Sequence, residues 1–232
     1  MIRSVAETGS TNDDVAILAR EGAAEGLWLR ADLQTGGKGR QGRAWLSPPG
    51  NLYASTLVRL QSGDPSAATL ALVAAVAAHE AVSAYASGVR IKWPNDLSAG
   101  DAKLAGILLE RQGEAVVIGF GVNLAHHPET LDRPATSIRR LSDSAPEPAD
   151  FLERLRDSFA RWLTTWRTQG LEPVREAWLG AAHPIGTALA TSDVQGQFDG
   201  LDSDGALRLR LADDSVRTVH AGDVFLDLAG PG

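Results

Sequence analysis

Apolar and polar positions alternate along several short segments of the chain and follow a helical period along others. Alternating or continuous apolar runs predict strands over residues 2–6, 27–33, 51–60, 89–93, 103–111 and 115–122. Helical spacing predicts helices over residues 65–86, 151–168 and 172–179, and the second of these carries Phe and Trp side chains along one face. Only a few residues separate the last strands from one another, which requires antiparallel hairpins.

Local signals indicate where two helices begin. Thr11 is followed three residues later by Asp14, the pattern of a capping box, so a further helix is expected with Thr11 at its N-cap. Asp64 precedes Pro65, which predicts a helix with Asp64 as its cap and Pro65 at its first position. Residues 125–149 are rich in Pro, Ser and Asp and predict a long surface connection.

The pattern changes after Pro184. From there on, short alternating segments are separated by turn signals such as Asp202-Ser203-Asp204-Gly205. A tail of this length, built of β-hairpins, has the size of a small barrel. We therefore expect two domains, an α+β domain over residues 1–183 and a β domain over residues 184–232.

Composition limits the classes of function. The chain has 232 residues, 44% of them hydrophobic, and can bury a sizeable core. A net charge of −7 and a pI of about 5.2 argue against an extended phosphate-binding surface, so any polyanion site must be local. The absence of cysteine excludes disulfides, thiolate zinc sites and thiol nucleophiles, and fits a reducing cytoplasm. Neither a secretion signal nor an apolar run of membrane-spanning length is found, so we expect a cytoplasmic protein without a membrane partner.

A glycine-rich loop, QTGGKGRQGRAW at residues 34–45, concentrates positive charge in this acidic chain. Its segment 37–42 matches the G-x-G-x-x-G pattern of dinucleotide-binding folds, but Pro48-Pro49 forbids the helix that must follow, and no second βαβ unit is predicted. A phosphate-binding P-loop requires Lys-Ser or Lys-Thr where this chain has Arg43-Ala44. The loop is therefore either a solvated hairpin tip or a local anion site of another kind.

The residue types in this loop suit an anion site. Glycines let backbone amides approach an anion, while Lys38, Arg40 and Arg43 supply charge and forked hydrogen-bond donors. Repulsion among the three cations is expected to leave the loop mobile until a ligand brings negative charge.

Further motifs accompany the loop. They are GSTND (residues 9–13), LSPPGNLYAS (46–55), KWPNDL (92–97), KLAGILLE (103–110) and GFGVN (119–123). In this order and spacing, together with the loop, the chain resembles biotin–protein ligases over residues 9–123, and its β-rich tail is consistent with the small SH3-like terminal domain of that family.

The resemblance implies a fold and a reaction. The fold is α+β, a mixed or antiparallel sheet with helices like the class II aminoacyl-tRNA synthetase core, plus a small C-terminal SH3-like β-barrel. In the reaction, biotin and ATP give biotinyl-5′-AMP and pyrophosphate with Mg²⁺, and a lysine of a biotin carboxyl carrier domain of a carboxylase then takes the biotinyl group. The enzyme would act as a monomer or homodimer. Since the chain begins almost at the first catalytic strand, no DNA-binding domain and no DNA partner are expected.

The family pattern also implies roles for individual residues. Biotin would be bound by Ser10, Thr11, Asn12, Gln34, Gly37, Gly39, Arg40, Gly42 and Lys103. ATP and the adenylate would be bound by Arg40, Arg43, Trp45, Asp96, Lys103 and Asn123. Lys103, Arg40 and Arg43 would supply the catalytic charge, and Asp96 would act on magnesium only indirectly, together with ATP.

Chemistry independently favours such residues. Attack of a carboxylate on the α-phosphorus builds negative charge on phosphoryl oxygens, which fixed cations stabilise more in the transition state than in the ground state. The ureido group of biotin needs a few placed donors and acceptors in an otherwise apolar slot, and hydroxyl and amide side chains provide them. A mobile loop that closes over the mixed anhydride would exclude water.

Departures and alternatives stay open. Lys38 replaces a commoner arginine and Gly36 a usual alanine, and loss of the guanidinium fork predicts slightly weaker retention of the intermediate. Ser10 and Thr11 are also explained as a plain helix cap, and Trp93 as core. His126-His127 lacks further ligands at metal-binding spacing and indicates a loop. A lipoate ligase or octanoyl transferase, and a binding module that has lost catalysis, are the rival functions.

Overall fold

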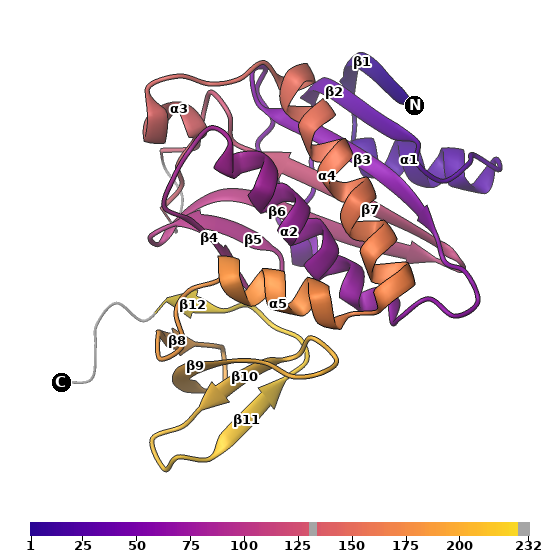
Figure 1. Ribbon diagram of the computed structural model, residues 1–232. Coiled ribbons are helices and arrows are strands. Elements are labelled where there is room, and N and C mark those ends of the chain that lie inside the picture. Colours follow the sequence, from indigo (N-terminus) through magenta and orange to yellow (C-terminus); the bar gives the residue numbers. More distant parts are fainter. Residues whose placement is uncertain (130–133, 227–232) are drawn as a thin grey trace.

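The computed structural model describes residues 1–129 and 134–226, which fold around two β-sheets (Figure 1). The larger sheet has the strand order β1-β2-β3-β7-β6-β5-β4. Its strands are β1 (Ile2–Thr8), β2 (Trp28–Gln34), β3 (Leu52–Arg59), β4 (Val89–Lys92), β5 (Asp96–Ala99), β6 (Ala102–Gln112) and β7 (Ala115–Val122). The smaller sheet, in the order β11-β10-β9-β8-β12, consists of β8 (Ala188–Ala190), β9 (Gln195–Leu201), β10 (Leu207–Arg210), β11 (Val216–Val219) and β12 (Phe225–Leu226).

Strand pairing agrees with the predicted mixed sheet. β1 runs parallel to β2, and every other neighbouring pair of the larger sheet is antiparallel. The hairpin predicted between residues 103–111 and 115–122 is confirmed, whereas direct pairing of residues 89–93 with 103–111 is wrong, because β5, which was missed, lies between β4 and β6. Its first residue, Asp96, belongs to the Pro-Asn-Asp segment that reads as a turn, and four residues are too few to show a period.

Helices cover the larger sheet unequally. They are α1 (Thr11–Arg20), α2 (Leu70–Ser83), α3 (Ile138–Ser142), α4 (Pro148–Gln169) and α5 (Glu172–Ala181), with single 3₁₀ turns η1 (Arg40–Gly42) and η2 (Ala67–Thr69). α2, α4 and α5 lie together over one face, whereas α1 packs on β3 and β7 from the other face (Figure 1). None of these helices is long and apolar enough to cross a membrane, as judged over the described residues.

The helix predicted to open at Thr11 is confirmed as α1, but its predicted cap is wrong, and so is the predicted start of α2. The N-cap of α1 is Ser10, which forms no side-chain capping bond, while the Thr11 side chain points to β3 and Asp14 accepts a hydrogen bond from Thr8. α2 begins at Leu70 rather than at Pro65. The carboxylate of Asp64 is already used, since it accepts a hydrogen bond from the backbone of Gln61 and bonds to the Arg167 side chain of α4.

The predicted surface connection over residues 125–149 is interrupted by helix. α3 forms within it, capped by the Ser137 hydroxyl, which accepts from the Arg140 amide at 3.3 Å. α4 begins at Pro148, inside the predicted connection and three residues before its apolar stripe starts. Residues 130–133 of this prediction lie outside the described part of the chain.

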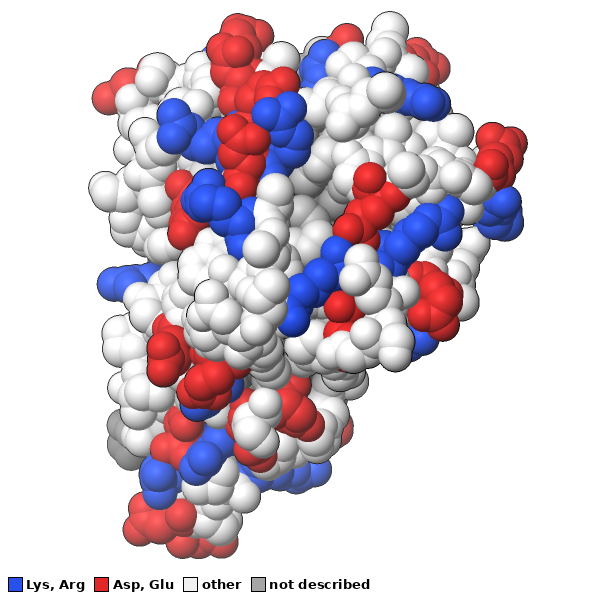
Figure 2. Space-filling model, turned by 45° about the vertical axis from the view of Figure 1, so that its right-hand side comes forward, with Lys and Arg blue, Asp and Glu red and all other residues white. Residues whose placement is uncertain are grey.

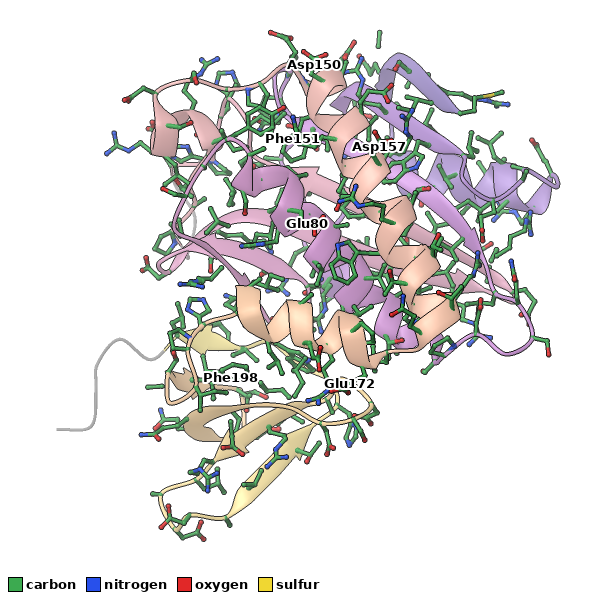
Figure 3. All side chains as sticks on the ribbon, viewed as in Figure 1. Glu80, Asp150, Phe151, Asp157, Glu172 and Phe198 are labelled. Atoms are coloured by element: carbon green, nitrogen blue, oxygen red, sulfur yellow. The ribbon has the colours of Figure 1, made fainter. Side chains whose placement is uncertain are left out.

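The smaller sheet packs against the helical side of the larger one. Phe198 of β9 lies below α5 and meets Trp178 with ring centres 6.2 Å apart (Figure 3). The Trp93 indole donates a hydrogen bond of 3.2 Å to the carbonyl of Gly205, and this glycine also lies against Leu72 of α2. Trp93 is 6% exposed, so its interpretation as core is confirmed, and it fixes the smaller sheet beside the site described below.

Candidate active site

A cavity of about 480 Å³ opens on the same face of the larger sheet as α1, over the part of that face that α1 does not cover. Its floor follows from strand register. Ser55 of β3 pairs with Gly119 of β7, and Gly121 of β7 pairs with Gly106 of β6, so these side-chain positions lie on one face of the sheet. The N-terminus of α1, the loop 37–45 and the segment around β5 form the sides.

Three glycines keep this floor open. A Cβ atom on Gly119 would lie 2.2 Å from Oδ1 of Asn12, and one on Gly121 would lie 2.5 Å from the Trp45 indole. A Cβ on Gly106 would lie 3.1 Å from the same indole. Separations below 3 Å are steric overlaps, so the sequence needs glycine at two of these positions for the site side chains to lie flat on the backbone.

A chain of hydrogen bonds runs beneath one end of the cavity. The amide of Thr11 donates to Oε1 of Gln34 at 2.8 Å, and the Thr11 hydroxyl lies 2.7 Å from that of Ser55. Ser55 in turn donates to Oδ1 of Asn12 at 2.6 Å, and Asn12 donates to Glu110 at 2.8 Å. Because the Ser55 proton is used on Asn12, the Thr11 hydroxyl donates, and its single proton is shared between Ser55 and Oε1 of Gln34, which lies 3.1 Å away. The chain therefore has one direction, and lone pairs of Thr11 are left for a ligand.

Two further groups at this end complete the polar lining. Ser10 is 4% exposed and lines the cavity, and no side chain or backbone group of the described residues hydrogen-bonds its hydroxyl. The Gln34 amide group donates to Ser47 at 3.1 Å, and Ser47 donates to the backbone carbonyl of Trp45 at 3.0 Å. This end of the cavity thus offers one uncommitted hydroxyl, and its glutamine is tied to the loop.

Backbone hydrogen bonds fold the loop 37–45 back on itself. Lys38 and Ala44 form an antiparallel bridge, and the Trp45 amide donates to the carbonyl of Gly37 at 2.9 Å. At the tip, Gln41 and Gly42 have φ values of 57° and 72°, the left-handed region that glycine adopts most readily. The buried Tyr53 hydroxyl holds the connection to β3 by donating to the Pro48 carbonyl at 2.7 Å, and burial raises its pKa.

Lys103 brings a positive charge to the middle of the cavity. Its Nζ atom lies 2.7 Å from Oδ1 of Asp96 and 5.5 Å from the centre of the Trp45 ring. The neighbouring Asn95 donates to the backbone carbonyl of Ile107, and its own carbonyl accepts from Arg40 at 3.3 Å. Trp45 Nε1 is buried against the backbone at Gly121 and has no hydrogen-bond partner among the described residues.

The two loop arginines meet the smaller sheet. Arg40 donates to the backbone carbonyl of Gly222 at 3.1 Å, and its guanidinium lies 3.5 Å from the carboxylate of Asp223. Arg43 lies 2.9 Å from the same carboxylate. The third loop cation, Lys38, is used differently, because its ammonium forms a hydrogen bond with Asp13 that raises the pKa of Lys38.

Asparagines order the segment that follows β7. Asn123 donates to the carbonyl of Thr136 at 3.0 Å and lines the cavity while only 4% exposed. Oδ1 of Asn51 accepts from the backbone amides of residues 124, 125 and 126 at 2.9 to 3.0 Å. Both side chains are buried, so their positions are fixed before any ligand binds.

Most of the predicted site residues meet in this cavity. Those that line it are Ser10, Thr11, Asn12, Gln34, Gly39, Arg40, Arg43, Trp45, Asp96, Lys103 and Asn123. Gly37 and Gly42 do not line it; Gly37 lies directly against Trp45, and Gly42 forms the loop tip. The described residues hold no cluster of three or more His, Cys, Asp or Glu side chains suited to a metal, and His127 bonds to Ser137, in line with its interpretation as loop.

Sequence reasoning missed other parts of the site. Ser55 and the floor glycines stand inside motifs that were recognised, but their common face appears only with the strand register. Asn95 was interpreted only as a turn residue, because it lies within the Pro-Asn-Asp segment. Asp223 carries no local signal, since its partners lie some 180 residues away in the chain.

Comparison with known proteins extends over nearly the whole chain. The Biotin/lipoate A/B protein ligase family model matches residues 10–123, and the model of the Biotin protein ligase C terminal domain matches residues 187–227. A Biotin--[acetyl-CoA-carboxylase] ligase of Paracoccus denitrificans is 39% identical, with 95% of this chain and 98% of that protein covered. The Bifunctional ligase/repressor BirA of Bacillus subtilis is 30% identical, with 94% of this chain and 71% of that protein covered.

Solved structures agree in fold. Biotin protein ligase of Aquifex aeolicus in complex with biotin and ATP superposes with a TM-score of 0.88 at 22% identity, covering 97% of this chain and 99% of that chain. Biotin protein ligase of Leishmania major in complex with biotinyl-5-AMP gives a TM-score of 0.69 at 28% identity, with coverage of 95% and 98%.

Proposed function

Since this chain belongs to the Biotin/lipoate A/B protein ligase family, we propose that its cavity binds biotin at the α1 end and ATP at the Lys103 end. The chain is a biotin–protein ligase, which uses ATP to adenylate biotin and then transfers biotin to a carboxylase. Its core is the α+β fold with a small SH3-like β domain. One observation supports the placement of the substrates: an ordered polar chain and five cationic side chains line a single cavity over a floor of glycine.

The polar end fits the ureido group of biotin. That group carries one carbonyl acceptor and two N–H donors, and the site presents the uncommitted Ser10 hydroxyl and the acceptor lone pairs of Thr11. Asn12 and Gln34 are already bonded within the protein, so they orient the hydroxyls. Gly119 lets the Asn12 side chain lie flat against the sheet, which leaves the space above Asn12 for the fused rings.

The cationic end fits the reacting phosphate. In the first step a carboxylate oxygen of biotin bonds to the α-phosphorus of ATP, and the bond to pyrophosphate breaks. Negative charge grows on the phosphoryl oxygens, where Lys103, Arg40 and Arg43 supply fixed positive charge. In the second step the carrier's lysine amine, as the free base, attacks the biotinyl carbonyl and AMP leaves.

The adenine and magnesium positions follow from the remaining lining. We assign adenine to the Trp45 ring and to Asn123, both of which line the cavity. Magnesium binds proteins through one or two carboxylates together with substrate phosphates, and Asp96 is one such carboxylate. Because Asp96 is paired with Lys103, its role toward magnesium is to hold MgATP and not to form a separate protein site.

The wider setting is also part of the proposal. We assign residues 1–183 to the biotin- and ATP-binding domain and residues 184–232 to the small β domain, and the protein partner is a biotin carboxyl carrier domain. Cysteine-free composition supports action in the cytoplasm. Net charge −7 and the mixed charges on the face seen in Figure 2 support the absence of a DNA partner. The enzyme acts as a monomer or a homodimer, and analytical sedimentation at the concentration used in the assays distinguishes the two states.

Biotin-dependent exchange of pyrophosphate into ATP tests the function. We expect exchange with biotin and none with lipoate, followed by transfer of labelled biotin to a purified carrier domain. Exchange that depends on lipoate would identify a lipoate ligase. Biotin binding in calorimetry without any exchange would identify a binding module.

A further inference from the structure

Asp223 bridges the two loop arginines from the smaller sheet. Its carboxylate lies 2.9 Å from Arg43 and 3.5 Å from Arg40, and its side chain is 20% exposed. The adjacent Gly222 carbonyl accepts a further hydrogen bond from Arg40 at 3.1 Å. Asp223 also lines the cavity, next to the buried Val224, so an acidic group of the C-terminal part stands inside the cationic end of the site.

The charges around the cavity are distributed unevenly. Two of the three lysines that line it are each paired with one carboxylate, Lys38 with Asp13 and Lys103 with Asp96. Arg40 and Arg43 instead share Asp223, which leaves one positive charge uncompensated within this triplet. Guanidinium groups stay protonated at any working pH, and they bind carboxylates and phosphates with the same forked geometry.

A phosphate that reaches Arg40 and Arg43 must therefore compete with the Asp223 carboxylate for their N–H groups. Both anions need the same N–H donors, and a carboxylate kept within 3.5 Å of the guanidinium groups would repel an incoming phosphoryl oxygen. The Arg43 side chain is 46% exposed, so it has room to turn from one anion to the other. Asp223 belongs to a segment that ends in the short strand β12, at the side of the smaller sheet nearest the larger one (Figure 1).

We propose that Asp223 is a positioning residue for adenylation, an internal stand-in for phosphate that holds Arg40 and Arg43 until the nucleotide displaces it. The inference rests on the proposed function, because the displacing anion is the phosphate of ATP or of the adenylate. In place of the ligand that was expected to bring the ordering charge, the carboxylate itself supplies negative charge to Arg40 and Arg43 of the empty loop, and it weakens nucleotide binding. Its release on phosphate entry links the smaller sheet to the state of the site.

Asp223→Asn tests this, because asparagine keeps the size and the carbonyl acceptor while removing the charge. We expect the KM for ATP in pyrophosphate exchange to fall two- to fivefold, the size of a partly exposed ion pair, with the KM for biotin unchanged. Asp223→Glu should keep a KM for ATP near that of the wild type. A merely structural role would instead raise the KM for ATP and lower the melting temperature.

Asp199→Asn is the matched control. Asp199 likewise bridges two arginines of the smaller sheet, Arg208 at 3.0 Å and Arg210 at 2.7 Å, but it does not line the cavity. We expect no change in the KM for ATP in this variant. An equal fall in both variants, or an unchanged or raised KM in Asp223→Asn, would overturn the proposal. Absence of exchange in the wild type would refute the proposed function instead.

Two measurements do not depend on kinetics. Trypsin should cut after Arg40 and Arg43 faster in ligand-free Asp223→Asn than in the wild type, and at equal rates once biotinyl-5′-AMP is bound. If Asp223→Asn fails to fold, a crystal structure of the wild type with biotinyl-5′-AMP decides. Asp223 separated from both guanidinium groups would support the proposal, and an intact bridge with phosphate bound would end it.

Discussion

Lys103 and Asp96 face each other across the β5–β6 hairpin, with 2.7 Å between Nζ and Oδ1. The pair fixes the ammonium before a substrate arrives, because a hydrogen-bonded carboxylate limits the rotation of the long lysine side chain. The Trp45 ring, 5.5 Å from the same nitrogen, limits it further. Preorganised charge of this kind stabilises a transition state without reorganisation during the reaction.

Lys103→Ala should reduce biotin-dependent pyrophosphate exchange by about a hundred- to a thousandfold, the usual effect of removing one charge-stabilising donor. Folding should be retained, since the Lys103 side chain is 37% exposed. Circular dichroism and thermal unfolding would check this. Arg111→Ala, at an exposed position of the same strand, is the control and should exchange normally. Wild-type exchange in Lys103→Ala would refute the role given to Lys103.

Trp45→Ala should raise the KM for ATP about tenfold, because an aromatic surface for a base contributes about 1 to 3 kcal/mol. The KM for biotin should change less, since the polar chain at the other end contains no Trp45 side-chain atom. Steady-state exchange with each substrate varied in turn gives both constants. A larger loss for biotin than for ATP would contradict the adenine assignment.

Gly119→Ala should weaken biotin binding strongly, because the new methyl group would overlap Oδ1 of Asn12 at 2.2 Å and displace the polar chain. Calorimetric titration with biotin alone measures the loss. Gly180→Ala on α5 is the control: no atom lies within 4 Å of its Cβ position, so the variant should bind biotin normally and gain up to about 1 kcal/mol in helix stability. Normal biotin binding by Gly119→Ala would show that the site does not require glycine at this position.

Ser55→Ala should lower biotin affinity about tenfold, since the buried Asn12 carbonyl and the Thr11 hydroxyl each lose a partner, a loss of about 1 to 3 kcal/mol. Ser158→Ala is the matched control, because Ser158 of α4 is equally buried but bonds to Glu80 of α2 (labelled in Figure 3), and neither residue lines the cavity. It should lose stability and keep its biotin affinity. Equal biotin affinities in the two variants would show that Ser55 does not orient the site.

Acid should destabilise the fold through Glu25. The hydrogen bond from Arg167, with 2.6 Å between the charged atoms, lowers the pKa of Glu25. A carboxylate whose pKa is lowered by folding stabilises the protein at pH values above its pKa in the unfolded chain. This stabilisation is lost as the pH falls through its pKa in the folded protein. The melting temperature should therefore drop below about pH 4, and less steeply in Glu25→Gln. Parallel curves for the two proteins would show that this pair has no part in acid unfolding.

Local patterns predicted what depends on local physics. The long strands and the amphipathic helix α4 follow from the period of their apolar residues, and the hairpin pairing follows from short connections. The start of α1 did not, because Thr11 has the chemistry of a cap but finds tertiary partners in Gln34 and Ser55. A Thr-x-x-Asp sequence looks the same whether the threonine caps the helix or bonds to distant side chains, so only the packed structure distinguishes the two arrangements.

Register and long-range charge were beyond prediction for a different reason. Gly106, Gly119 and Gly121 are visible in the letters, but a one-residue slip would turn each of them to the opposite face. The Asp223 bridge depends on where two sheets dock, which no periodicity encodes. Motif recognition thus found the polar and charged residues of the site. It missed the glycines that make room for their side chains and the carboxylate that pairs with the two arginines.

The floor of glycine limits which compounds the site can be altered to accept. Main-chain atoms lie directly beneath Asn12 and Trp45, so no substitution at the glycines themselves can make the slot deeper. A bulkier biotin analogue would have to be accommodated sideways, for instance by trimming Leu108 or Leu46 at the walls. Natural or engineered change in substrate choice should accordingly collect on the walls, while the depth of the slot stays constant.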